Sequence, residues 1–487
     1  MENAIDVVEQ LAFDFLGKAA DRIDLLPQSG SDRRYFRLFS DEHRYIATYN
    51  QHVFENNAFI YYSRHFRSKA LRVPEILFVN EPVTAYVQED LGSVSLLNIL
   101  EREGYTEQVK ELFMRSLHEL ARLQVLGNQG IDYQKAITAK EFGKQAIISD
   151  LLYFKYYFLD TLQEPYDKQA ILDDFEALAT YLTHTEYKFF MFRDFQSRNI
   201  MIRDGQPWFI DYQGGMYGAP HYDAASMIWQ ARANLPEDWK AELVERYMDM
   251  LEEIIGDNID RALFLNQYYG YTLIRILQVL GAYGFRGLFE RKAQFLTSIP
   301  QALNNLKYFV HQRPIAIHVP EFKRLLARLV ENDIISRFQP PVASPDNPMT
   351  VYLNSFSYKD NGYPGDESDN GGGFVFDCRG ILNPGRQDAY KPLTGLDKEV
   401  MDYLEQKTRM PNFLNSAWDM VDITVADYLS RGFTRLMVNF GCTGGQHRSV
   451  YAAEQTAGHL RNKFKVKTVV THLNREKWPV WQGMEEC

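Results

Sequence analysis

One stretch decides the fold of the first half of this chain: Phe192-Arg193-Asp194-Phe195-Gln196-Ser197-Arg198-Asn199-Ile200-Met201. A turn at 203–205 and a short apolar run follow it, and the run ends at Asp211. Phosphoryl transfer needs a carboxylate that orients and deprotonates the acceptor hydroxyl, and oxygen ligands that hold Mg²⁺ against the phosphates of a nucleotide. The spacing therefore predicts Asp194 as the catalytic base, and Asn199 and Asp211 as ligands of the metal ion.

Each of these three side chains, taken alone, has a structural explanation, because aspartate and asparagine are common in turns and at strand ends. Their joint spacing favours catalysis, since one base and two metal ligands occur together in the order that phosphoryl transfer requires. The short apolar runs at 188–192 and 207–211 predict two strands that flank this loop.

The surrounding segments predict a mixed α+β domain. Short apolar runs between turn residues, from Ser29 to about Asn80, predict a small antiparallel sheet. Apolar residues recur at helical spacing between Glu107 and Gln124, and most of the chain from there to Ile334 has the same period. A sheet-rich part is thus expected to precede a helix-rich part.

These motifs resemble those of the aminoglycoside phosphotransferase and choline kinase superfamily over roughly residues 10–330, most of all the anomeric kinases of N-acetylmuramate and N-acetylglucosamine. The resemblance implies a bilobal fold of the protein-kinase type, with ATP and Mg²⁺ as cofactors. It also implies a phosphate-covering hairpin at Ser29, Gly30 and Ser31, in which small residues let backbone N–H groups approach the nucleotide. Gln88 and Asp90 would belong to the hinge that holds adenine.

The acceptor site is less legible from the sequence. In the related sugar kinases the acceptor lies against helices that follow the hinge, and the aromatic run at 150–158 offers ring faces and polar tips suited to a sugar. An aromatic-rich core helix explains the same run equally well.

Two residues depart from the pattern of that superfamily. Phe192 replaces the histidine that usually begins the catalytic loop, and Thr48 stands where a lysine or arginine would pair with the nucleotide phosphates. A pseudokinase that only binds nucleotide therefore remains an alternative. The presence of Asp194, Asn199 and Asp211 together favours an active enzyme.

A proline-rich segment predicts the domain boundary. Residues 338–348 hold four of the 19 prolines of the chain, and this composition propagates neither a helix nor a central strand. We expect a kinase-like domain at 1–337, a linker at 338–348 and a smaller α/β domain at 349–487. In the last of these, strands are predicted at 374–377 and 435–440, and helices at 398–429 and 449–464.

The second domain contains a candidate phosphate-binding loop between a strand and a helix. Its residues are Cys442, Thr443, Gly444, Gly445, Gln446, His447, Arg448 and Ser449. Backbone N–H groups, the start of the helix and an arginine together suit an anion. A cysteine followed after five residues by an arginine is also the spacing of a cysteine-dependent phosphatase, and a tight turn with a buried cysteine is the structural alternative.

Residues 355–479 resemble the C-terminal domain of the RNase adapter protein RapZ. The matching segments include 355–359, 376–379, 392–397 and 472–477 as well as the loop itself. The resemblance implies a site for a phosphorylated amino sugar, with Asp377, Arg379 and Asn383 near the phosphate. RNA is disfavoured as a partner, because the chain ends in an acidic and aromatic segment at 478–487.

Composition bounds the function. The 487 residues are 45% apolar and 24% charged, which predicts a globular chain of at least two domains. No apolar run is long enough to span a membrane, and three cysteines with no secretory signal predict a cytoplasmic protein. The net charge of −11 opposes a broad nucleic-acid-binding face.

Together these features predict an ATP- and Mg²⁺-dependent kinase that phosphorylates a hydroxyl group of a sugar or amino sugar and is fused to a domain that binds a phosphorylated amino sugar. The alternatives are a non-catalytic adapter and, less favoured, a cysteine phosphatase in the second domain. The oligomeric state stays open.

Overall fold

The computed structural model of the chain describes residues 4–26, 33–137, 139–290, 293–296, 298–313, 315–360, 362–366 and 372–479. The chain divides into two compact units. The first comprises Met1–Phe285 and Gln301–Glu331, and the second comprises Arg286–Pro300 and Asn332–Cys487. The division falls before the proline-rich segment, which lies between helix α13 (Asn332–Ser336) and the first strand of the second unit.

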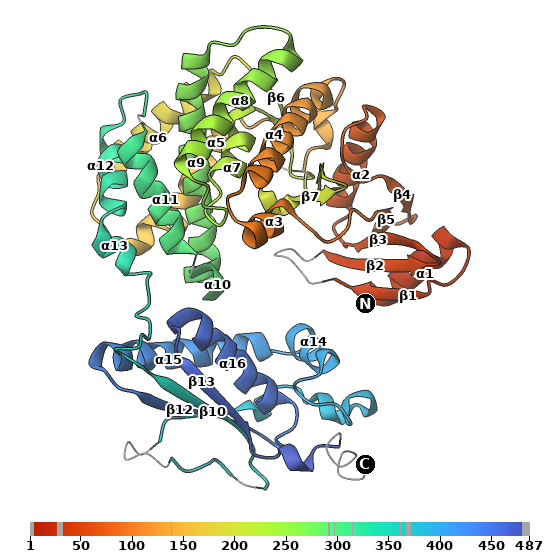
Figure 1. Cartoon of the computed structure of the whole chain (residues 1–487), viewed down its shortest axis with the longest axis vertical. Coiled ribbons are helices and arrows are strands. Elements are labelled where there is room, and N and C mark those ends of the chain that lie inside the picture. The colour runs from red at the N-terminus through yellow and green to blue at the C-terminus, as the bar shows by residue number, and fades with distance from the viewer. Residues whose placement is uncertain are drawn as a thin grey trace. The chain divides into compact units, whose positions relative to one another are not determined.

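A five-stranded antiparallel sheet forms the beginning of the first unit, in the order β1-β2-β3-β5-β4. Its strands are β1 (Arg22–Leu25), β2 (Arg34–Ser40), β3 (His43–Tyr49), β4 (Ile76–Val79) and β5 (Ala85–Glu89). Helix α1 (Ala4–Leu16) lies against this sheet (Figure 1). Its buried Val8 and Leu11 share a core with Phe36 and Leu38, and removal of this apolar surface from water holds helix and sheet together.

Helix α2 (Val53–Ser68) corrects the prediction that residues 29–80 form only a sheet. Its sequence is rich in phenylalanine and tyrosine, which favour strands when they are judged by local propensity. In the structure Tyr62 and Phe66 are fully buried and lie 5.4 and 4.9 Å from the ring of Phe190. Tertiary burial of one aromatic face therefore outweighs the weak helix propensity of these residues.

Two short strand pairs carry the predicted catalytic loop. Strand β6 (Phe189–Met191) pairs with β9 (Met216–Gly218), and β7 (Ile200–Arg203) pairs with β8 (Gln206–Phe209). The loop between β6 and β7 ends in a single 3₁₀ turn at Ser197–Asn199. Both ends of the loop are thus anchored in strands: β6 and β8 overlap the two predicted strands, whereas β7 was not predicted.

The rest of the first unit is helical (Figure 1). Its helices are α3 (Leu96–Glu103), α4 (Glu107–Asn128), α5 (Lys144–Tyr157), α6 (Lys168–Thr183), α7 (His221–Ile228), α8 (Glu237–Ile255), α9 (Arg261–Tyr283), α11 (Ile299–Gln312) and α12 (Pro320–Leu329). A π-helix at Gly284–Phe289 and the short α10 (Ala293–Leu296) follow α9, and residues 286–300 are grouped with the second unit. Helix α9 packs along both α5 and α7. Within the described ranges, no helix is apolar over a length that would cross a membrane.

The second unit is the predicted α/β domain. Its four strands are parallel and lie in the order β11-β12-β10-β13. They are β10 (Thr350–Ser357), β11 (Phe374–Asp377), β12 (Arg435–Cys442) and β13 (Lys467–His472). The helices are α14 (Lys398–Lys407), α15 (Met410–Arg431) and α16 (Arg448–Phe464). The single helix predicted for 398–429 is two helices, because Pro411 starts a new one at the first turn of α15.

Candidate active site

The structure brings the three predicted catalytic residues together. The amide nitrogen Nδ2 of Asn199 donates to the backbone oxygen of Asp194 at 2.9 Å and lies 3.3 Å from Oδ2 of Asp211. Asn199 sits at the end of the 3₁₀ turn, and Asp211 follows β8. Antiparallel pairing of β7 with β8 therefore closes the distance between residues that are well separated in sequence.

Asp194 is held by an arginine that the sequence analysis did not identify. Nη2 of Arg275, on α9, lies 3.1 Å from Oδ1 of Asp194, and Arg275 is 4% exposed. Burial alone would raise the pKa of Asp194, but Arg275 and then Arg193 and Arg198 outweigh it, so the pKa is lowered. The carboxylate is therefore ionised at neutral pH, as a base must be before it accepts a proton.

Asp211 has a different environment. Burial raises its pKa, and the hydrogen bond that it accepts from Gln213 at 2.8 Å opposes that shift. Its backbone φ of 72° lies in the left-handed region, which is costly for a residue other than glycine. Such strain persists only where surrounding contacts enforce it, and it concentrates at functional sites.

One buried carboxylate positions the catalytic loop. Asp223, at the start of α7, accepts hydrogen bonds from the backbone N–H groups of Phe192 and Arg193 at 2.7 and 2.9 Å. It also accepts one from Gln124 of α4 at 2.9 Å. Burial raises the pKa of Asp223 to about 7, while the hydrogen bonds from Phe192 and Gln124 oppose the shift.

Arg193 is fixed by a second carboxylate. Its two terminal nitrogens pair with Asp150 of α5 at 2.9 and 2.8 Å, and its guanidinium lies 4.5 Å from the ring centre of Phe142. Its φ of 82° is again left-handed. Asp150 belongs to the aromatic run considered above as an acceptor site, and its structural role is to hold the loop.

Phe192 replaces the expected histidine without leaving a gap. Its side chain is fully buried, and its ring lies 5.3 Å from that of Phe195 and 5.9 Å from that of Tyr212. The loop is therefore supported by aromatic packing and by the backbone hydrogen bond to Asp223.

Asp211 and Asn199 fit a magnesium ion. Magnesium prefers oxygen ligands and is commonly bound by one or two protein side chains together with phosphate oxygens and water. A carboxylate and a side-chain amide 3.3 Å apart could provide such a pair, and the oxygen of the amide would be the ligand from Asn199. In the described part of the chain, His, Cys, Asp and Glu side chains do not gather in groups of three that could hold a metal without a nucleotide.

The predicted nucleotide-binding residues have different outcomes. Ser29, Gly30 and Ser31 lie outside the described residues. Gln88 is buried in β5, and its Oε1 is without a hydrogen-bond partner. Asp90 follows β5 and pairs with Arg37 of β2 at 2.8 Å, so its carboxylate ties the hinge segment to the sheet. Thr48 is fully buried in β3 and supplies no positive charge.

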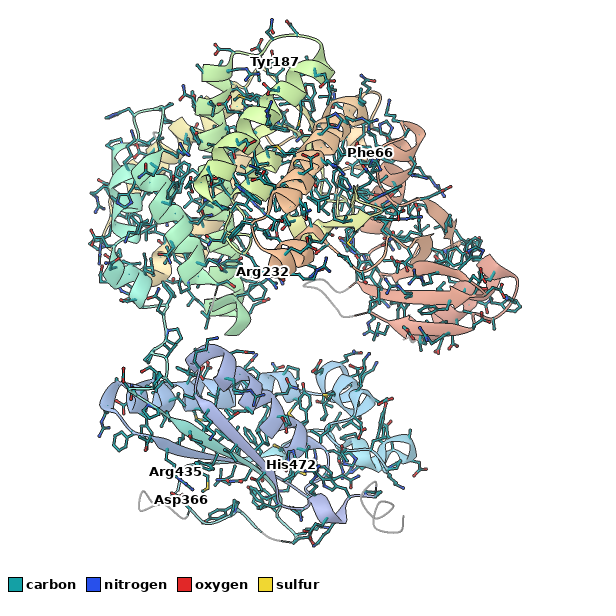
Figure 2. The ribbon with its side chains drawn as sticks, in the orientation of Figure 1. Phe66, Tyr187, Arg232, Asp366, Arg435 and His472 are labelled. Carbon is teal, nitrogen blue, oxygen red and sulfur yellow. The ribbon has the colours of Figure 1, made fainter. Side chains whose placement is uncertain are left out.

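A cavity that opens to solvent lies beside the predicted catalytic loop. Its lining includes Gln196 and Arg198 from the loop, Arg275 and Tyr283 from the α9 region, and Asn305 from α11. Arg232, labelled in Figure 2, also lines it and pairs with Glu101 of α3 at 2.8 Å. The cavity thus has polar groups, cations and aromatic edges, and it reaches the arginine that holds Asp194.

Sequence reasoning missed Asp223, Arg275 and this cavity. Both residues lie in helices whose other residues are largely apolar, and a charged side chain there is almost always buried against a partner. A charged residue in an apolar helix can therefore be recognised from the sequence, but its partner cannot be identified. The partner comes from a different helix or from the loop.

In the second unit, the predicted phosphate-binding loop joins β12 to α16. Sγ of Cys442 accepts a hydrogen bond from the N–H of Gly445 at 3.2 Å and lies 3.1 Å from Oγ of Ser449. Gly445 has a φ of 65°, and a Cβ atom there would lie 2.4 Å from Asn474. Only glycine therefore fits that position of the loop.

Arg448 contributes to the architecture of that loop. One terminal nitrogen lies within 3.4 Å of three carbonyl oxygens, those of Cys378, Arg379 and Ile381. The other lies 3.3 Å from Oγ1 of Thr443. The Nε atom is buried without a partner. The Nε–H group of the guanidinium is therefore available for an anion.

The remaining predicted contacts surround this loop. Asp377 ends β11 and pairs with Arg379 at 2.7 Å, with both side chains about half exposed. Asn383 accepts a hydrogen bond from the N–H of Gly385 at 3.3 Å. His447 is buried and its Nε2 lies 2.8 Å from the carbonyl oxygen of Tyr390. Gly444 has open space at its Cβ position.

Comparison with known families assigns both units. Residues 23–262 match the phosphotransferase enzyme family, and residues 349–476 match the RapZ C-terminal domain. The chain joins a phosphotransferase-family domain to a RapZ C-terminal domain. The resemblances to the phosphotransferase family and to the RapZ C-terminal domain are thereby confirmed, and the closer likeness to anomeric sugar kinases stays a prediction.

Solved structures of similar fold include a choline kinase from Cryptosporidium parvum, with 13% identity over 66% of this chain and 99% of that one (TM-score 0.46). Another is a choline/ethanolamine kinase family protein from Mesorhizobium loti, with 16% identity over 67% of this chain and 99% of that one (TM-score 0.44). A third is a thermostable mutant of an aminoglycoside phosphotransferase, with 17% identity over 61% of this chain and 97% of that one (TM-score 0.40).

Curated relatives match a quarter of the chain. A nucleotide-binding protein of Shewanella halifaxensis is 36% identical over 123 residues, which are 25% of this chain and 41% of that protein. One from Lactobacillus acidophilus is 37% identical over 128 residues, which are 26% and 42%. The matches therefore span about two fifths of the length of these relatives.

Asp223 gives a prediction about stability. Because its pKa is raised on folding, the folded state binds a proton more tightly than the unfolded state, and stability from this group is lost as pH rises toward 7. Relative to Asp223→Asn, the wild-type free energy of unfolding should fall by about 3 kcal/mol between about pH 5 and pH 8. Urea denaturation of both proteins across this range measures the difference. The prediction would be contradicted if the free energies of unfolding of the two proteins changed equally with pH.

Arg275 gives a prediction about the pH dependence of phosphoryl transfer. Replacing it with methionine removes the nearest positive charge and leaves the burial, so the pKa of Asp194 should rise. The acid limb of the kcat profile should therefore move to higher pH. Arg232→Met, which removes another arginine of the same cavity, is the control and should leave the limb in place. An unmoved limb in Arg275→Met would contradict the assignment.

Proposed function

We propose that the first unit is an ATP- and Mg²⁺-dependent kinase that phosphorylates a hydroxyl group of a sugar or amino sugar. The observation that carries the proposal is the convergence of Asp194, Asn199 and Asp211 beside a cavity, in a domain of the phosphotransferase enzyme family. Asp194 would accept the proton of the acceptor hydroxyl. Asn199 and Asp211 would hold Mg²⁺, which neutralises charge on the phosphates of the nucleotide.

The cavity supports a small polar acceptor. Hydrogen-bonding groups such as Gln196 and Asn305 suit hydroxyl groups, and the ring of Tyr283 provides a flat apolar edge of the kind that packs against a sugar. The cavity lies among α7, α9 and α11, whereas the sequence analysis considered the aromatic run of α5.

We assign the second unit the binding of a phosphorylated amino sugar. Backbone N–H groups of Thr443, Gly444, Gln446 and His447, the N-terminus of α16 and the Nε–H of Arg448 would hold the phosphate. Binding is favoured over hydrolysis by Cys442, because the terminal nitrogens of Arg448 already contact protein oxygens, and a phosphatase needs that guanidinium on its transition state. One unit would thus make a phosphosugar and the other would bind one.

The catalytic role of Asp194 is tested by Asp194→Asn in the full chain. Loss of the base should reduce kcat by about 10²- to 10⁴-fold across a panel of hexoses and hexosamines, while binding of Mg²⁺-ATP is retained. Phosphorus NMR of the product identifies the phosphorylated hydroxyl. Asp204→Asn, which is 92% exposed in the turn after β7, is the control and should match the wild type. A wild-type chain that binds nucleotide but is as inert as Asp194→Asn would instead support the adapter alternative.

The phosphosugar site is tested by Gly445→Ala. A methyl group there meets Asn474 and is strained at this φ, so the loop must shift, and affinity for glucosamine 6-phosphate should fall at least about tenfold. Isothermal titration calorimetry of the full chain measures it. The matched control is Gly458→Ala on α16, which has open space at the Cβ position. Equal affinities of wild type and Gly445→Ala would place the ligand elsewhere.

A further inference from the structure

Arg33 lies where a phosphate-binding cation is needed. Kinases of this general type pair a lysine on the third strand with a glutamate on the following helix, and the lysine contacts the nucleotide phosphates. In this chain the third strand offers the uncharged Thr48, whose backbone lies opposite Tyr35 of β2. The residue that immediately precedes β2 is Arg33.

The guanidinium of Arg33 makes one of these two contacts, the one with a helix glutamate, and it also lies near the predicted metal ligand. Nη2 lies 2.5 Å from Oε1 of Glu55, in the first turn of α2. Nη1 lies 3.5 Å from Oδ1 of Asp211, the predicted metal ligand. Glu55 is itself oriented by Asn50, whose Nδ2 donates to its other oxygen at 2.8 Å. A helix glutamate, a cation and the carboxylate after β8 thus form one continuous chain.

The same side chain has unused capacity for an anion. Arg33 is 6% exposed, and its Nε is buried without a hydrogen-bond partner. A buried N–H donor without a partner costs roughly 1–3 kcal/mol, so such groups in native structures call for an explanation. A phosphate oxygen near the metal ligand would satisfy this donor, because guanidinium groups bind phosphate through adjacent N–H groups.

We propose that Arg33, from the strand next to β3, supplies the positive charge for the nucleotide phosphates in place of the missing basic residue at Thr48. The inference rests on the proposed kinase function and adds a residue to it. It removes the main sequence-based reason for considering the first unit a pseudokinase. It also makes Glu55 a positioning residue that acts through Arg33.

Nucleotide affinity tests the proposal without requiring turnover. In the full chain with Mg²⁺, Arg33→Met should weaken ATP binding by about 10- to 100-fold, as expected for loss of a charged hydrogen-bond donor, and adenosine binding by less than about twofold. Arg33→Lys should retain affinity for ATP within about tenfold, because it keeps the charge. The control is Arg34→Met. Arg34 is the next residue in the chain, and successive side chains of an extended segment point in opposite directions.

The outcomes separate this proposal from the kinase function. Equal ATP affinity of wild type and Arg33→Met would overturn the role of Arg33 even if the enzyme is active. Equal losses for ATP and adenosine would also overturn it, since they would indicate damage to the fold. If the wild type binds ATP but phosphorylates no acceptor, the kinase function fails while the affinity comparison still decides the role of Arg33. A wild-type chain that binds no nucleotide would overturn both.

Discussion

The carboxylate of Asp223 is the constraint on which the catalytic loop depends. Two consecutive backbone N–H groups, of Phe192 and Arg193, are removed from water where β6 ends, and each would cost free energy if it had no acceptor. Asp223 accepts from both, and from Gln124 of α4 as well. The side chain of Asp223 therefore joins helices α4 and α7 to the loop. These hydrogen bonds fix the position of Asp194 in the loop.

Arginines pair with the carboxylates around the loop, and two of these arginines, Arg275 and Arg33, are buried. Asp150 neutralises Arg193, Arg275 lies against Asp194, and Arg33 lies between Glu55 and Asp211. A buried ion pair contributes little net stability, because desolvation offsets attraction, but it fixes geometry. The main effect of these ion pairs is therefore to hold the carboxylates at fixed distances. The network includes positions where the backbone is strained.

Much of this could be read from the sequence, because the decisive signals are local. The spacing of Asp194, Asn199 and Asp211 follows from a hairpin whose two strands are adjacent in the chain. The strand–loop–helix at Cys442 is equally local, as is the apolar period of α4. Helix α2 was missed because burial of its aromatic face, a non-local effect, overrides its strand-like composition.

The sequence by itself determined which chemical groups are present and how the two domains follow one another. Only the tertiary structure decided which groups meet. Arg275 reaches Asp194 from α9, Arg33 lies before β2 and near Asp211, which follows β8, and Arg448 contacts carbonyl oxygens near β11 as well as its own loop. These partners are far apart in the chain. Packing and desolvation determine which partner a buried charge meets, and neither effect produces a periodic pattern in the sequence.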